Sequence, residues 1–165
     1  MARMRQAADT AGVIAPPPLL LAGVIVFGLL LDWLLPAYVL EALLSLTERI
    51  IIGLILIASG AAITFPALRG FRAVGTRVEP WKPSTRLVTD GIFAWLRNPM
   101  YVGGTLFLIG LSILLASDWI LVLTLLFAVV MHYGVVLREE RYLEAKFGDD
   151  YRRYKASVPR YGIPG

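Results

Sequence analysis

The sequence predicts an all-α integral membrane protein with four transmembrane helices, a cytoplasmic loop and a C-terminal helical tail. Three observations support this fold class. First, 58% of the 165 residues are hydrophobic and the mean hydropathy is +0.70, more apolar surface than a soluble domain of this size needs. Second, four apolar runs are each close to the length that crosses about 30 Å of hydrocarbon at about 1.5 Å per residue. They are residues 19–35, 50–65, 100–117 and 119–137.

The third observation is the distribution of the basic residues. Fifteen of the 16 lie before the first run, between the second and third runs, or after the fourth, and only Arg49 lies elsewhere. Four spans put those three segments on one face of the bilayer, and the positive-inside rule makes that face cytoplasmic. We therefore expect both termini in the cytoplasm. Topology also accounts for the net charge of +4, so we expect the membrane, and no nucleic acid, as a partner.

The first apolar run is expected to be a retained anchor. Residues 1–18 form a cytoplasmic N-terminal lead that ends in three prolines at the membrane surface. The run that follows is long, contains Asp32 and lacks a clear small-residue cleavage site, unlike a signal peptide. Residues 42–45 are expected to extend the second span outward. Asp32 and Arg49 both lie toward the outer face and are expected to pair across the first two spans.

The connections between the later spans follow from proline, glycine and capping residues. Residues 66–98 contain prolines and several glycines, so we expect a cytoplasmic loop rather than one helix. Only Ser117 and Asp118 separate the last two spans, which predicts a tight antiparallel hairpin with Asp118 as the N-cap of the fourth span. The transmembrane domain therefore covers residues 19–137, including this loop.

The C-terminal tail, residues 138–165, is expected to be helical and cytoplasmic. Residues 139–147 continue the fourth helix into water, Gly148 ends it, and Asp149 caps a second helix that reaches about Ala156. The second helix carries basic residues and two tyrosines, as an interfacial helix does near lipid headgroups.

Two adjacent carboxylates, Glu139 and Glu140, lie where the fourth span leaves the membrane. Two like charges at such a place need water or a cation. One interpretation is a solvated helix extension that is balanced by Arg138 and Arg141. The other is a carboxylate that binds a cationic ligand, and the residues alone leave both open.

His132 is the only histidine of the chain and lies two helical turns before Glu139, on the same helix face. An ionisable group inside a membrane is a functional candidate, and the alternative is a neutral histidine hydrogen-bonded within the bundle. The chain has no cysteine, and no carboxylate lies four residues from His132, so we expect no metal site. The GxSxG and GxGxxG motifs of hydrolases and nucleotide-binding folds are also absent.

The third span begins with residues that suit a helix start. Asn98 can cap the helix and Pro99 fits its first turn. The glycines Gly103, Gly104 and Gly110 permit close helix packing, and they also leave room for a ligand.

Two motifs resemble those of a known enzyme superfamily. LVTDGIFAWLRNPMYVGG, residues 87–104, is followed after about one helical hairpin by REERYLEAKFGDDYRRYKASVPRY, residues 138–161. Together they resemble the isoprenylcysteine carboxyl methyltransferase and phospholipid methyltransferase superfamily, and the resemblance extends over about residues 53–161. It implies an integral-membrane enzyme that uses S-adenosyl-L-methionine, releases S-adenosyl-L-homocysteine and methylates a lipid-like acceptor.

The resemblance also implies a cofactor pocket formed by the cytoplasmic loop and the tail. Its lining would be Leu87, Val88, Phe93, Arg97, Asn98, Pro99, Tyr101, Gly103, Glu139 and Glu140. The two glutamates would hold the cationic part of the cofactor, because sulfonium and ammonium groups favour carboxylate and aromatic neighbours. For catalysis, Arg138 or Arg97 would hold a carboxylate acceptor, whereas Glu140 or His132 would deprotonate an amine acceptor.

Two classes of acceptor fit the resemblance. Isoprenylcysteine enzymes have histidine where this chain has Asn98, whereas NPMY is closer to phosphatidylethanolamine N-methyltransferases. The arginine expected on the acceptor side falls near Val135, and Arg138 lies one turn further on. We therefore expect an isoprenylcysteine-like carboxylate or an amine-headgroup phospholipid as the acceptor. The alternative function is a non-enzymatic four-helix membrane scaffold or binding module.

Overall fold

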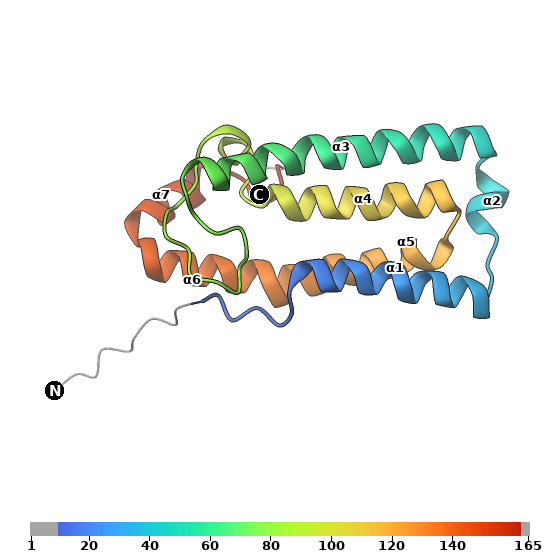
Figure 1. The fold of residues 1–165 in the computed structure, drawn as a ribbon, viewed down its shortest axis with the longest axis horizontal. Coiled ribbons are helices and arrows are strands. Elements are labelled where there is room, and N and C mark those ends of the chain that lie inside the picture. Colours follow the sequence, from blue (N-terminus) through green and yellow to red (C-terminus); the bar gives the residue numbers. More distant parts are fainter. Residues whose placement is uncertain (1–9, 163–165) are drawn as a thin grey trace.

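The computed structural model describes residues 10–162, and the regular elements in this part of the chain are helices (Figure 1). Four long helices run side by side, and a loop and two further helices gather at one end of the bundle. In chain order the elements are α1 (Pro17–Leu34), α2 (Val39–Leu43), α3 (Leu46–Ala73), the 3₁₀ turn η1 (Gly91–Ala94), α4 (Pro99–Leu115), α5 (Asp118–Met131), the π-helical turn η2 (His132–Val136), α6 (Leu137–Phe147) and α7 (Asp149–Ser157).

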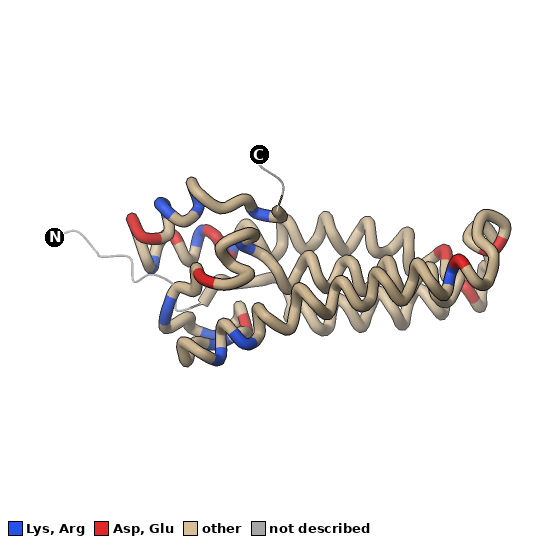
Figure 2. The backbone as a smooth tube through the Cα atoms, turned by 90° about the horizontal axis from the view of Figure 1, so that it is seen from above, with Lys and Arg blue, Asp and Glu red and all other residues tan. Residues whose placement is uncertain are grey.

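Three helices are long and apolar enough to cross a membrane: α1, α3 and the continuous helix of α5, η2 and α6. α4 is a shorter apolar helix of 17 residues. Many large apolar side chains of these helices point outward; Phe27, Leu54 and Leu125 are 61%, 52% and 68% exposed. Charged residues gather at the two ends of the bundle, and the length between them carries almost none (Figure 2). This surface suggests a membrane protein, because a soluble domain rarely exposes so large an apolar area.

α3 and α4 pack backbone against backbone through glycines. A Cβ on Gly60 would lie 2.6 Å from the carbonyl oxygen of Gly103, and a Cβ on Gly103 would lie 2.7 Å from that of Gly60. Gly53 and Gly110 meet in the same way further along the two helices. Small residues allow such close contacts between helices in lipid. Gly103, which we expected in the wall of a cofactor pocket, therefore serves helix packing, because no space for a ligand is left beside it.

The end of α3 that lies away from the loop, which we call its outer end, differs from the prediction. Residues 42–45 do not extend the helix, since α2 is a separate short element and Leu44 is extended. Ser45 begins α3 in a capping box: its hydroxyl accepts from the backbone N–H of Glu48, and the Glu48 carboxylate accepts from the backbone N–H of Ser45. The capping box stops the helix at Ser45, so it cannot continue outward.

The end of α3 next to the loop, which we call its inner end, also differs from the prediction. The helix passes Pro66 and continues to Ala73, so the loop begins at Val74 rather than at residue 66. Contacts that are distant in sequence hold this extension, because Ala67 and Phe71 pack against the segment that contains Phe93. The local proline signal is therefore outweighed by tertiary packing.

Ser117, rather than Asp118, caps α5. The Ser117 hydroxyl accepts from the backbone N–H of Ile120 at 3.0 Å. The Asp118 carboxylate instead accepts from two backbone N–H groups at the start of α2, each at 3.0 Å. The predicted tight hairpin between α4 and α5 is present, but the Asp118 carboxylate stabilises the start of α2 instead of the start of α5.

The predicted pair between Asp32 and Arg49 is not formed. The Asp32 carboxylate accepts a hydrogen bond from the hydroxyl of Ser117, at the start of α5. Arg49 forms an ion pair with Glu41 at 3.4 Å. Each of the two residues thus finds a partner on the element that lies next to it in the bundle.

The described part of the predicted N-terminal lead is residues 10–18, of which residues 17 and 18 already belong to α1, and residues 1–9 lie outside the described part of the chain. Pro16 precedes α1 as its N-cap residue.

At the other terminus, α6 ends at Phe147 and Gly148 follows with a φ of 56°, as predicted for a helix-ending glycine. Asp149 is the first residue of α7 and makes no capping hydrogen bond.

Candidate functional site

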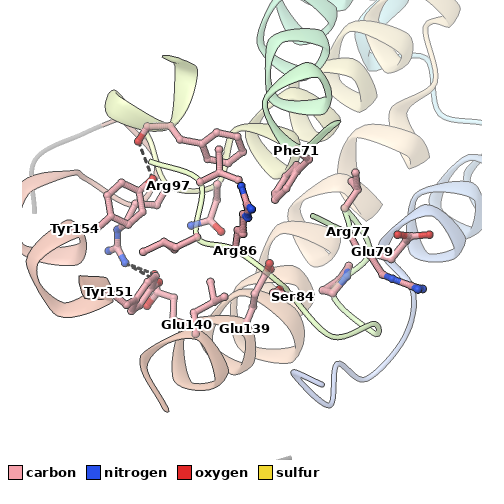
Figure 3. A pocket seen from close by; sticks show the side chains of 17 residues that line it. Phe71, Arg77, Glu79, Ser84, Arg86, Arg97, Glu139, Glu140, Tyr151 and Tyr154 are labelled. Atoms are coloured by element: carbon pink, nitrogen blue, oxygen red, sulfur yellow. Dashed lines mark hydrogen bonds and ion pairs between the residues drawn. The ribbon is translucent and has the colours of Figure 1, made fainter. Parts of the chain in front are cut away.

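A polar pocket lies at the end of the bundle where the loop and the tail meet (Figure 3). Its empty volume, which includes space open to solvent, is about 580 Å³. The side chains come from the inner end of α3, the loop, and helices α6 and α7. They include Phe71, Arg77, Glu79, Ser84, Arg86, Leu87, Val88, Phe93, Arg97, Asn98, Glu139, Glu140, Leu143, Tyr151 and Tyr154. The pocket therefore unites the two sequence motifs, which are separated along the chain by a helical hairpin.

Thr76 fastens the loop that forms one wall of this pocket. Its hydroxyl accepts from the backbone N–H groups of Thr85 and Arg86 at 3.0 and 3.3 Å. The hydroxyl of Thr85 donates in return to the carbonyl of Gly75 at 3.4 Å. These bonds join the two limbs of the loop, so that the segment starting at Leu87 runs along the pocket.

The wall formed by this segment is apolar and aromatic. Leu87, Val88 and Phe93 line it, and η1 places the Phe93 ring edge-to-face against Phe71, with ring centroids 5.1 Å apart. In Figure 3, Phe71 approaches the pocket from the side opposite the two glutamates of α6. A slot of this kind fits a flat heteroaromatic ring.

Glu140 is buried and fully paired. Its carboxylate accepts from Arg97 Nη1 at 2.8 Å and from Arg160 through two bonds of 2.8 Å each. Burial alone would raise the pKa of the Glu140 carboxyl, but the hydrogen bonds and charges of the two arginines outweigh it and lower the pKa. Glu140 is therefore ionised at neutral pH and holds two segments together.

Glu139 has a different environment, although it is the adjacent residue. Its carboxylate accepts from the Tyr101 hydroxyl at 2.7 Å, and no cation is paired with it among residues 10–162. Burial raises the pKa of Glu139 to about 6; the Tyr101 hydrogen bond opposes this rise, and the charge of Glu140 adds to it. Glu139 is only partly exposed, and a carboxylate in such a place without a cation is costly, so this group is suited to a cationic ligand.

The RNP sequence before α4 holds the end of the tail. The backbone N–H of Arg97 donates to the carbonyl of Pro159 at 3.0 Å, and its Nε donates to that of Val158 at 2.9 Å. The Asn98 side chain donates to the carbonyl of Arg160 at 3.3 Å and makes no capping bond, in contrast to the predicted cap. These three bonds hold residues 158–160 in the position from which the Arg160 side chain contacts Glu140.

We predicted that the tyrosines of α7 lie near lipid headgroups, but the structure buries them in the wall of the pocket. Tyr151 and Tyr154 are 2% and 8% exposed. The Tyr154 hydroxyl donates to the carbonyl of Phe93 at 2.7 Å, and Arg97 Nη1 lies 3.4 Å from the Tyr151 hydroxyl. Burial, with the charge of Glu140, raises the pKa of Tyr151 to about 12, so it remains neutral.

The other predicted site residues lie around this pocket. Pro99 and Tyr101 line a small adjoining cavity together with Glu139. Arg138 lies outside both cavities, and its Nη1 donates to the carbonyl of Gly12 at 2.9 Å. His132 also lies outside them. Among the described residues, no group of three histidine, aspartate or glutamate side chains could bind a metal.

Two apolar grooves meet at Tyr101, on either side of α4. One lies between α4 and α5, and it ends at His132, whose Nδ1 is 2.8 Å from the Tyr161 hydroxyl. The other is lined by the start of α1, by α5, and by Trp81 of the loop. The hydrogen bond between Tyr101 and Glu139 thus separates the polar pocket from grooves that open along the apolar helices.

Sequence reasoning missed Arg160, Phe71 and the burial of the α7 tyrosines. Leu143, Phe147, Tyr151 and Tyr154 repeat at intervals of three or four residues, a pattern that indicates a buried helix face. That pattern was available in the sequence and would have identified the tyrosines. Arg160 follows α7 in an irregular segment, and no local pattern distinguishes it from the other basic residues.

A known protein family matches more than half of the chain. The family model for phospholipid methyltransferase matches residues 48–150, which run from the outer end of α3 to the first residues of α7. The matched region contains the loop, the RNP sequence and both glutamates, but not the tail end with Arg160.

Three similar proteins illustrate the relationship. A protein-S-isoprenylcysteine O-methyltransferase of Schizosaccharomyces pombe is 44% identical over 81 residues, which are 47% of this chain and 33% of that protein. A protein of the same name from Xenopus laevis is 37% identical over 81 residues, 49% of this chain and 28% of that protein. An uncharacterized protein of Haemophilus influenzae is 39% identical over 62 residues, 38% of this chain and 98% of that protein. The match with the two methyltransferases thus spans about a third of their length or less.

Proposed function

Because the chain belongs to the phospholipid methyltransferase family, we propose that it is an integral-membrane enzyme that uses S-adenosyl-L-methionine to methylate a lipophilic acceptor. The observation that carries this proposal is the hydrogen bond between Glu139 and Tyr101. Among the described residues it leaves a partly buried carboxylate without a cation at the boundary between a polar pocket and two apolar grooves. A reaction between a polar cationic cofactor and an apolar acceptor needs such a boundary.

We propose four membrane spans, with the pocket and both chain termini on the cytoplasmic face. The spans are α1, α3, α4 and α5, and the 17 residues of α4 cover about 25 Å at about 1.5 Å per residue. The pocket lies at the end of the bundle that carries most of the basic residues, and the positive-inside rule favours the cytoplasm for that end (Figure 2).

The chemistry of the pocket fits the cofactor. Phe71, Leu87 and Val88 offer an apolar slot for the adenine, and Glu139 offers a carboxylate for the ammonium or sulfonium. The cofactor supplies a methyl group that is already activated for transfer. Arg97 and Arg160 already pair with the Glu140 carboxylate. Glu139 is therefore the anionic group that would bind the ligand.

The protein's part in the reaction is to align the acceptor and to exclude water. Tyr101 would orient Glu139, and an apolar chain in either groove would bring its head group to this pair. For an amine acceptor, Glu139 would accept the proton, because Glu140 already accepts from two arginines. His132 lines one of the grooves and is a second candidate. A carboxylate acceptor needs no base, and Arg160, which is 31% exposed, would bind it.

Equilibrium binding of S-adenosyl-L-homocysteine to the detergent-purified protein tests this function. We expect saturable binding that Glu139→Gln weakens about tenfold, equivalent to about 1.4 kcal/mol. The control is Glu144→Gln on the same helix, where the carboxylate pairs with Lys155; it should bind like the wild type. Absence of binding, or equal binding by the two variants, would contradict the proposal and favour a non-enzymatic membrane scaffold.

A second experiment distinguishes the two acceptor classes. Membranes that contain the protein are incubated with S-adenosyl-L-methionine labelled in its methyl group, and the lipids are extracted. Base-labile label released as methanol indicates a methyl ester, as expected for an isoprenylcysteine-like carboxylate. Base-stable label in amine-headgroup lipids indicates N-methylation. No label above that of the Glu139→Gln membranes would contradict a lipophilic acceptor.

A further inference from the structure

The segment before α1 crosses the fourth long helix at its π-helical turn. The backbone N–H of Ile14 donates to the carbonyl of Gly134 at 3.2 Å. Arg138 reaches back from the next turn and donates to the carbonyl of Gly12 at 2.9 Å. Val13 packs against the buried cluster that contains Met131 and Val135. We call residues 12–16 the N-terminal strap.

Gly134 is the residue that lets the strap approach. A Cβ at this position would lie 2.3 Å from Cδ1 and 2.7 Å from Cγ1 of Ile14, closer than carbon atoms can pack. Ile14 is itself 52% exposed, so its side chain contributes little burial to the fold. A glycine with this contact, opposite a half-exposed side chain, is better explained by the docking of the strap than by the packing of a core.

The strap docks immediately before the two glutamates. A π-helical turn inserts one extra residue, and each residue of a helix corresponds to about 100° of rotation. The residues that follow η2 are therefore rotated about the helix axis, relative to the positions they would have if α5 continued as a regular α-helix. Whether Glu139 points to Tyr101 consequently depends on the persistence of η2 in its π form. Single π turns of this kind often occur at functional sites.

We propose that the N-terminal strap is a positioning element: it holds η2 in its π form and thereby directs Glu139 into the cofactor pocket. Ile14 and Gly134 form the contact, and Arg138 fastens the strap on the side of the glutamates. Arg138, which the sequence suggested as a binding group for the acceptor, acts here through the backbone of the strap. The consequence for cofactor binding rests on the function proposed above.

A compensating pair of substitutions tests this role. Gly134→Ala should displace Ile14 and weaken S-adenosyl-L-homocysteine binding at least about fivefold, because small misplacements of a binding group are costly. Adding Ile14→Ala removes the clashing atoms and should restore the affinity to within about twofold of the wild type. Gly23→Ala is the matched control, since a Cβ there meets nothing within 4 Å. Thermal unfolding of each variant separates lost binding from lost stability.

Two outcomes of this cycle would overturn the proposal. If Gly134→Ala binds as well as Gly23→Ala, the strap does not position the site. If the double variant binds no better than Gly134→Ala alone, the loss belongs to the helix and not to the contact with Ile14. The proposal is also overturned if Gly134→Ala loses binding and stability equally and Ile14→Ala restores neither.

A disulfide tests the docking of the strap directly, and the affinity of the oxidised protein then tests its role in positioning the site. The chain has no cysteine, so the pair Ile14→Cys and Gly134→Cys can be oxidised without competing thiols. We expect the disulfide to form in membranes and the oxidised protein to bind S-adenosyl-L-homocysteine like the reduced one. Failure of the disulfide to form, or loss of binding on oxidation, would overturn the positioning role. If the wild type itself binds no S-adenosyl-L-homocysteine, the proposed function fails, and disulfide formation alone decides whether the strap docks.

Discussion

The seam between α3 and α4 and the wall of the polar pocket share α3 but are stabilised in opposite ways. Along the seam, the glycines bring the two backbones into contact, and the side chains of Thr64, Ile57 and Leu114 pack against them. At the pocket, the side chains of Arg97, Glu140 and Arg160 carry the contact. Apolar helices gain little hydrophobic energy from meeting in lipid, so close packing has to hold them together. The polar end can use charges because several donors satisfy the buried carboxylate of Glu140.

Within the pocket, the two adjacent glutamates also differ, in the donors that their carboxylates have. Glu140 is saturated by arginines and joins the tail to the RNP sequence, whereas Glu139 has one neutral donor. A saturated charge is a structural group, and an unsaturated one is available to a ligand. Four predictions test the comparison between the seam and the pocket and the comparison between the two glutamates, from the largest expected effect to the smallest.

Glu140→Ala should have the largest effect on stability. It leaves Arg97, whose side chain is 8% exposed, without its carboxylate, and the loss of one partner of a buried ion pair costs about 3–5 kcal/mol. Thermal unfolding in detergent measures the loss. The surface variant Glu144→Ala is the control, and a similar loss in both variants would show that Glu140 is no structural group.

Gly103→Ala should disrupt the seam without touching the pocket. The new Cβ would lie 2.1 Å from Thr64 Oγ1 and 2.7 Å from the Gly60 carbonyl oxygen, and the strain of such overpacking costs about 1–3 kcal/mol. At the neighbouring Gly104, a Cβ meets only Leu21 Cδ1, at 3.6 Å, so Gly104→Ala is the matched control. Equal unfolding temperatures for the two variants would contradict backbone contact along the seam.

Glu139 should make the stability of the wild type fall between acidic and neutral pH. Its pKa is raised from 4.5 to about 6 in the folded protein, so its contribution is fully present below 4.5 and is lost as the pH rises through 6. The expected loss is about 1–2 kcal/mol, because one pKa unit corresponds to about 1.4 kcal/mol. Unfolding of the wild type and of Glu139→Gln across this range measures the difference. A pH dependence shared by both would assign the titration to another group.

Asn98→Ala should have the smallest effect of the four. It removes one hydrogen bond of 3.3 Å to the tail, which is equivalent to about 1 kcal/mol. Affinity for S-adenosyl-L-homocysteine should change less than in Glu139→Gln. If Asn98→Ala instead loses more affinity than Glu139→Gln, Asn98 contacts the ligand directly.

The helices and the general position of the site could be predicted from the sequence. Hydropathy and the spacing of basic residues are local properties, so they located the long apolar helices and the end of the molecule with the pocket. The two motifs identified Leu87, Val88, Phe93, Glu139 and Glu140, all of which line the pocket. The ends of α3 were wrong where contacts distant in sequence outweighed local signals such as Pro66.

Only the tertiary structure decided the partners of the polar residues. Glu139 and Glu140 are the same residue type at neighbouring positions, and their sequence surroundings do not distinguish them. One meets Tyr101 and the other meets Arg97 and Arg160, because successive residues of a helix point about 100° apart toward different elements. The sequence by itself therefore determined that apolar helices carry a pair of carboxylates to a polar end. The fold alone determined which carboxylate is paired and which is available, because pairing depends on groups that only folding brings within hydrogen-bond distance.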